Sequence, residues 1–113
     1  MPRLVLGPLL RHIGETDATV WVETDEACEV EVLGHRTRTF AVAGHHYALV
    51  VVEGLAPGTR SEYGVALDGV PAWPEPGSRF PPSAVSTLGG PGSLRILFGS
   101  CRVSFPHERP YTL

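Results

Sequence analysis

The sequence has little that would build helices. No stretch of globular-helix length shows apolar residues repeating at helical spacing. The 113 residues include 13 glycines and 11 prolines, which disfavour helix interiors and favour turns. A mean hydropathy of +0.05 and 42% hydrophobic residues are typical of a folded chain. These features predict an all-β domain made of short strands.

Positive charge is also scarce. The formal net charge is -3, whereas a surface that binds nucleic acid or an anionic membrane needs a clustered positive field. The nearest approach to such a cluster is the pair Arg36 and Arg38, which share one face of an expected strand and are typical of a solvated edge. We therefore expect no nucleic-acid partner and no membrane partner.

Cysteines and long apolar runs are equally few. The two cysteines, Cys28 and Cys101, are too few for a disulfide-stabilised scaffold, and we expect no bond between them. Gly7-Pro8 interrupts the apolar N-terminal run, which is too short for a signal core or a membrane span. A cytoplasmic location is the default expectation, and export of a longer parent protein stays open.

Short apolar segments separated by turn residues recur about every ten residues. Strands are expected at 4–10, 18–24, 28–32, 36–42, 47–52 and 84–88, with a further strand ending at Leu67. Asp68-Gly69 is a hairpin signal. This spacing predicts an antiparallel β-sandwich over residues 1–88, followed by a glycine and proline linker at 89–93.

Alternation assigns most strand faces. The residues expected to face the core are Cys28, Val30, Val32, Phe40, Val42, Tyr63, Val65 and Leu67. The run 47–52 is continuously apolar and predicts a strand buried on both faces or nearly so. Segment 18–24 leaves its inward face open, because Val20 and Trp21 lie on opposite sides of the strand.

The segment 71–82 holds five prolines and is expected to be an irregular surface loop. Its aromatic residues, Trp73 and Phe80, are the candidates for an interaction site. One interpretation has them folded back over an open end of the sandwich. The other has them docked on a further domain, which would leave them exposed in this chain.

Residues 55 to 63 carry a resemblance. Leu55, Pro57, Gly58, Thr59 and Tyr63 resemble the Leu-x-Pro-x-Thr-x-Tyr signature of fibronectin type III domains, although three residues instead of one separate Thr59 from Tyr63. The resemblance implies an immunoglobulin/fibronectin type III-like antiparallel β-sandwich. It also implies that Trp21 belongs to the core.

A second resemblance depends on the order of segments. An opening Gly7-Pro8, a sandwich, a short linker and the strand Ile96–Arg102 resemble the N-terminal half of alkaline phosphatase D-like (PhoD-like) phosphoesterases. The resemblance implies that residues 94–113 are the truncated first strand of a metallophosphoesterase catalytic domain. The chain would then be the noncatalytic N-terminal module of a phosphatase or phosphodiesterase, with that catalytic domain as its partner.

The same resemblance bears on metals. It implies divalent or mixed metal ions in the parent's catalytic domain, with Cys101 as a ligand in the intact parent only. The fragment itself is expected to hold no cofactor and to have no catalytic residue. We expect the five histidines, including the adjacent His45 and His46, to lie on the surface near turns.

Two nucleophile interpretations are rejected on spacing. A phosphatase-type nucleophile at Cys101 needs an arginine six positions on, where the chain has His107. Ser100 lacks the second glycine of a nucleophile elbow, which Arg102 replaces. The alternative function is a stand-alone fibronectin-like module that binds protein or carbohydrate through Trp73, Trp21 or its strand edges.

Overall fold

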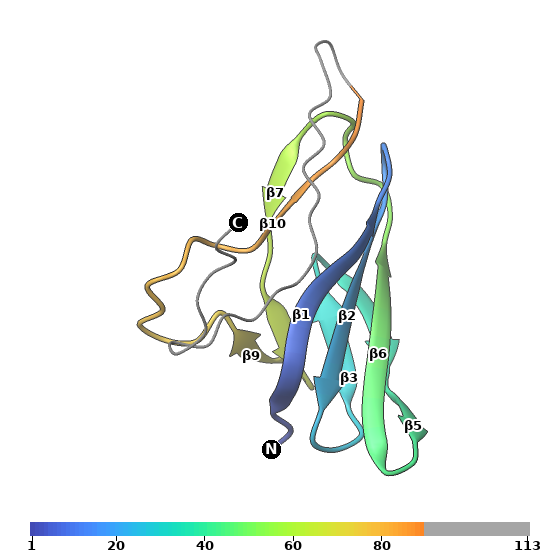
Figure 1. The fold of residues 1–113 in the computed structure, drawn as a ribbon, viewed down its shortest axis with the longest axis vertical. Coiled ribbons are helices and arrows are strands. Elements are labelled where there is room, and N and C mark those ends of the chain that lie inside the picture. The colour runs from blue at the N-terminus through green and yellow to red at the C-terminus, as the bar shows by residue number, and fades with distance from the viewer. Residues whose placement is uncertain (90–113) are drawn as a thin grey trace, which may run out of the picture.

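The alternating residues of the sequence form antiparallel strands stacked in two layers (Figure 1). The computed structural model describes residues 1–89. The expected linker beyond Gly89, the truncated catalytic strand at 94–113 and Cys101 lie outside the described residues.

Two four-stranded sheets and one short pair make up the fold. The first sheet has the order β1-β2-β6-β5 and contains β1 (Leu4–Ile13), β2 (Ala18–Thr24), β6 (His45–Val52) and β5 (Phe40–Val42). The second has the order β4-β3-β8-β9 and contains β4 (His35–Arg38), β3 (Glu29–Val32), β8 (Val65–Leu67) and β9 (Val70–Trp73). β7 (Arg60–Glu62) pairs with β10 (Ala84–Ser86). The fold is the expected all-β, immunoglobulin/fibronectin type III-like antiparallel β-sandwich.

The core lies between the two sheets and consists largely of valine. Its buried apolar residues are Ala18, Val20, Val22, Cys28, Val30, Val32, Ala48, Val50, Val52, Tyr63, Val65, Leu67 and Val85. β2 therefore turns Val20 inward and Trp21 outward, which settles the face that the sequence left open. The inward positions expected for Cys28, Val30 and Val32 are confirmed, as are those of Tyr63, Val65 and Leu67.

Two expectations about the first sheet are wrong. Phe40 and Val42 were expected to face the core, but each is 53% exposed. β6 was expected to be buried on both faces, but Leu49 and Val51 are 44% and 45% exposed. The physical reason is the same in both cases, because only one face of this sheet packs on the second sheet and no described element covers the other.

Trp21 is not the core tryptophan that the resemblance implies. Since Val20 and Val22 point inward, the indole between them lies on the outer side of β2, where it is half-buried. Its ring stacks on Tyr47 of β6 with centroids 5.4 Å apart. The tryptophan therefore belongs to the outer surface of the first sheet.

The proline-rich segment is partly regular. Its first residues form β9, which pairs with β8 across the hairpin turn predicted at Asp68-Gly69. Both turn residues have positive φ, 49° and 81°, as such hairpin turns require. The backbone of β9 passes so close to Gly64 that a Cβ there would lie 2.7 Å from the Trp73 carbonyl oxygen. Only the part after Trp73 is the irregular loop that was expected.

Candidate functional site

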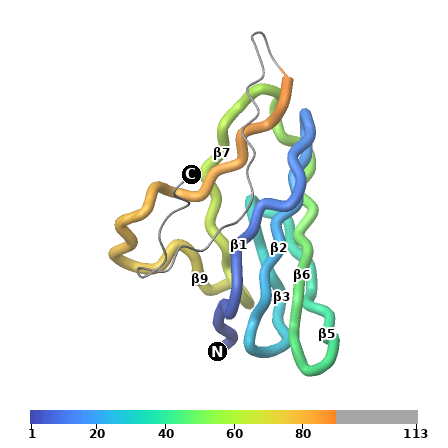
Figure 2. The backbone as a smooth tube through the Cα atoms, in the orientation of Figure 1, coloured from blue at the N-terminus to red at the C-terminus, as the bar shows by residue number. Residues whose placement is uncertain are grey.

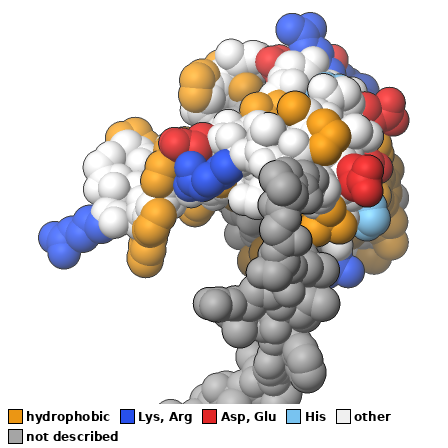
Figure 3. Space-filling view, turned by 90° about the horizontal axis from the view of Figure 1, so that it is seen from above, with side chains coloured by type: hydrophobic (Ala, Val, Ile, Leu, Met, Phe, Trp, Pro, Cys, Tyr) orange, Lys and Arg blue, Asp and Glu red, His pale blue; other side chains and the backbone are white. Residues whose placement is uncertain are grey.

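The loop from 74 to 83 projects from the sandwich, as Figures 1 and 2 show at the left of the molecule. The space-filling view from above shows the same projection as a lobe with apolar and basic side chains (Figure 3). The Phe80 ring is 81% exposed, the highest value for any large apolar side chain here except that of Met1. An aromatic ring held so far into solvent is a candidate contact for a partner.

Trp73 fixes the base of this loop. Its half-buried ring packs against the core at the end of β9, and its Nε1–H donates to the Ser83 hydroxyl oxygen at 3.1 Å. A shallow hollow of about 390 Å³ is lined by Trp73, Phe80, Glu75, Ser78 and Arg79. The structure therefore brings the two predicted interaction residues into one hollow, with Trp73 anchored and Phe80 free.

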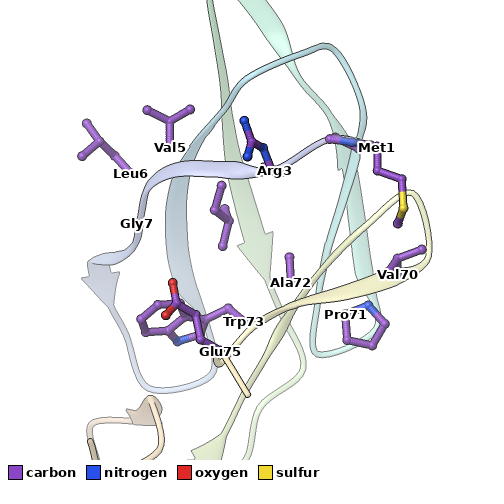
Figure 4. Close-up of a pocket in the computed structure, with 12 residues that line it drawn as sticks. Met1, Arg3, Val5, Leu6, Gly7, Val70, Pro71, Ala72, Trp73 and Glu75 are labelled. Carbon is purple, nitrogen blue, oxygen red and sulfur yellow. The ribbon is translucent and has the colours of Figure 1, made fainter. Parts of the chain in front are cut away.

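A larger cleft of about 640 Å³ opens where the edges of the two sheets diverge. One wall is the N-terminal half of β1, and the other is β9 with Trp73 and Glu75 (Figure 4). Val5 and Leu6 are among the lining residues, and Figure 4 shows their side chains directed away from Trp73 and Ala72. Trp73 thus lines both the cleft and the hollow beside Phe80.

Charged contacts fix the start of β1 beside this cleft. The backbone N–H of Arg3 donates to Asp25 Oδ1 at 2.7 Å, and its Nε donates to Oδ2 at 3.4 Å. The backbone hydrogen bond, aided by the Arg3 guanidinium, lowers the pKa of the Asp25 carboxyl below its usual value. These contacts hold the strand in place and leave the cleft itself lined mostly by apolar groups.

The outer surface of the first sheet is a second candidate. Because residues opposite one another on paired strands share a face, the register places apolar side chains from all four strands there. We call it the outer apolar face, and it consists of Leu6, Leu9, Trp21, Phe40, Val42, Tyr47, Leu49 and Val51. The ring of Tyr47 lies near the rings of Trp21, Phe40 and His45, at 5.4, 6.0 and 6.0 Å between centroids.

One hydrogen-bonded pair of polar side chains interrupts the outer apolar face. Glu23 is only 7% exposed, and its Oε2 lies 2.8 Å from His45 Nδ1. The outer surface of the second sheet is charged instead, since Glu29, Glu31, Arg36 and Arg38 point outward and Arg36 pairs with Glu31 at 3.1 Å. The apolar character is therefore a property of one sheet and not of the whole surface.

The structure also places the histidines of residues 1–89. His45 contacts Glu23, and His35 uses both ring nitrogens, one with the Leu33 carbonyl oxygen and one with the Glu53 N–H. In this part of the chain, no three His, Cys, Asp or Glu side chains converge in a way that could hold a metal ion. His107 and the proposed ligand Cys101 lie outside it.

Sequence reasoning missed the outer apolar face as a site. The signal was present, because the run 47–52 and the pair Phe40 and Val42 are more apolar than a sheet with one buried face requires. That excess was interpreted as extra core. A solvent-facing position for the same residues was the alternative that the pattern allowed.

No helix among the described residues is long and apolar enough to cross a membrane.

Comparison with known proteins gives one match. A family model described as "Domain of unknown function (DUF7800)" matches residues 1–85, which cover most of the sandwich. No curated protein and no solved structure matches the chain.

Proposed function

The chain belongs to the DUF7800 family, and on the resemblance of residues Ile96–Arg102 we propose that it is the noncatalytic N-terminal module of a PhoD-like metallophosphoesterase. In this proposal the module docks on its parent's catalytic domain through Trp73 and Phe80. The parent would hydrolyse phosphate esters with divalent or mixed metal ions, which the catalytic domain would bind with Cys101 among the ligands. The sandwich would supply binding surface and no chemistry.

One structural observation carries the docking part of the proposal. Phe80 holds its ring in solvent on a projecting loop whose base is tied to the core by Trp73. Exposing an aromatic ring forgoes a burial worth about 1.5–3 kcal/mol. A partner surface that covers Phe80 would recover that burial, and the anchored Trp73 reduces the entropy that the loop loses on docking.

The identity of the parent is supported by the sequence alone. The sequence Ile96–Arg102, which is expected to form a strand, and its position after the sandwich and the expected linker are similar to PhoD-like enzymes. The backbone hydrogen bonds of the described fold continue to Leu88, whose N–H donates to the Gly14 carbonyl oxygen at 3.0 Å. A second domain that begins a few residues later is compatible with this end of the fold.

The first test is the source gene. The proposal expects the reading frame to continue past Leu113 into Asp- and His-containing ligand motifs, and a frame without them would overturn it. The purified 113-residue chain should give no turnover of bis(4-nitrophenyl) phosphate with added Zn²⁺, Fe³⁺ or Ca²⁺. Metal-dependent turnover by this chain would overturn the noncatalytic assignment.

The second test addresses docking in the longer gene product. Phe80→Ser should lower the melting temperature of the parent while leaving that of the 113-residue chain unchanged, because the ring is free in the latter. Arg38→Ser is the control and should change neither melting temperature, since Arg38 is exposed on β4 and lines neither the hollow nor the cleft. Equal effects of Phe80→Ser in both chains would show that the ring has no docking role.

A further inference from the structure

The outer apolar face is a large apolar surface that no described element covers. Six of its side chains, Leu6, Leu9, Phe40, Val42, Leu49 and Val51, are 44–55% exposed. The four strands are 10, 7, 8 and 3 residues long, which at roughly 3.3 Å per residue and about 4.8 Å between strands gives a footprint of roughly 440 Å². Exposed apolar patches of this size mark interaction sites in soluble proteins.

The chemistry of the face restricts what can cover it. Apart from His12 and Thr19 near one end, its polar groups are Glu23 and His45, which satisfy each other at 2.8 Å. A charged ligand or a nucleic acid would find no complementary field there. An apolar surface whose one carboxylate is already hydrogen-bonded fits a second apolar surface.

We propose that the outer apolar face is a self-association surface that binds a second copy of this chain. Two sheets pack face to face at about 10 Å with strands nearly aligned, as the two sheets do within each sandwich. Two copies would bury roughly 900 Å² in total, which is close to the roughly 1,000 Å² that separates specific interfaces from weak ones. We therefore expect weak association that depends on protein concentration.

The position of Glu23 selects the orientation of the two copies. Glu23 and His45 lie at the end of the face where β6 begins, while Thr19 and Val51 lie toward the opposite end. A two-fold axis in the interface plane and perpendicular to the strands sets the Glu23 end of one copy against the Val51 end of the other. An axis parallel to the strands would bring the two carboxylates together, which like-charge repulsion disfavours.

Analytical ultracentrifugation of the full 113-residue chain tests the proposal. A monomer–dimer equilibrium is expected over roughly 1–200 μM. Leu49→Glu should weaken association by roughly 100-fold, because a symmetric interface carries the charge twice and each buried charge costs at least about tenfold. Arg38→Glu is the matched control on the charged outer surface of the second sheet and should leave the equilibrium unchanged.

Trp21 provides a second readout at the interface itself. The chain has two tryptophans, and Trp73→Phe leaves Trp21 as the single emitter. Its emission should shift to shorter wavelength as the concentration rises, since the dimer removes the ring from water. The shift should be absent when Leu49→Glu is added.

Three results would overturn the proposal. The chain could be monomeric at every concentration, which would leave the outer apolar face to a different domain. Association could persist in Leu49→Glu, which would place the contact elsewhere on the chain. Arg38→Glu could dissociate the dimer equally, which would indicate a general charge effect. If Leu49→Glu fails to fold by circular dichroism, Phe40→Ser on the edge strand β5 supplies the same comparison.

Discussion

The indole N–H of Trp73 donates a hydrogen bond to the Ser83 hydroxyl oxygen at 3.1 Å and joins the two ends of the projecting loop. Ser83→Ala should cost about 1 kcal/mol of unfolding free energy, the usual contribution of such a bond. Urea denaturation measures it, with Ser86→Ala in the adjacent strand β10 as the control because Ser86 is exposed. Equal midpoints for the Ser83 variant and the wild type would show that the bond does not hold the loop.

The burial pattern of β6 predicts opposite results for two adjacent valines. Val50 is 1% exposed and Val51 is 45% exposed. Val50→Asp buries an unpaired charge and should unfold the domain, whereas Val51→Asp should change the unfolding free energy by at most about 0.5 kcal/mol in dilute solution. Thermal melts followed by circular dichroism compare the two variants. Similar melting temperatures would mean that the inward face of β6 is assigned wrongly.

Much of this fold could be predicted from the sequence because most strands reveal one apolar face. Cys28, Val30 and Val32 alternate with glutamates. Because successive side chains of a strand point to opposite faces, burying the three apolar residues puts the glutamates in solvent and fixes the orientation of the strand. The Asp68-Gly69 turn was predictable because few dipeptides accept positive φ at both positions. These are local signals, and each is contained within a few residues.

The outer apolar face could not be predicted because its signal is ambiguous. A strand that is apolar on both sides is either buried twice or exposes one side, and only the number of layers decides between them. Phe40 and Val42 illustrate the difficulty, since nothing local shows that β5 is at an edge with its apolar side outward. The position of Trp21 likewise depends on which side of β2 receives the second sheet.

The hydrogen bond between His45 and Glu23 should stabilise the domain. The carboxylate is buried beside Tyr47, and the His45 ring provides its hydrogen bond at 2.8 Å. His45→Ala should destabilise the domain by about 1–2 kcal/mol, because a buried acceptor loses its partner. The double variant His45→Ala with Glu23→Gln should recover part of that loss. A double-mutant cycle from urea unfolding measures the coupling, and additive losses would show that the two residues do not interact.

The hydrogen bonds of the Thr87 side chain indicate where the fold ends. Its hydroxyl donates to the Ala56 carbonyl oxygen at 2.6 Å and accepts the Thr59 N–H at 3.0 Å. A chain ending at Gly92 should keep cooperative unfolding and a melting temperature close to that of the full chain. A chain ending at Ser86 loses both bonds and should melt lower by several degrees. Loss of cooperativity in the longer truncation would instead show that residues after Gly92 belong to the domain.

Two buried groups make the stability fall at alkaline pH. Burial raises the pKa of the Tyr63 phenol above 10.0 and that of the Cys28 thiol above 9.0. As the pH rises, the phenol and the thiol therefore lose their protons in the unfolded chain before they do so in the folded chain. Their contribution to the free energy of unfolding is complete below pH 9 and is lost as the pH rises through the folded-state pKa values. Urea midpoints measured between about pH 8 and 11 should fall less steeply in Tyr63→Phe and in Cys28→Ala than in the wild type. A wild-type slope in both Tyr63→Phe and Cys28→Ala would mean that neither group keeps its proton on folding.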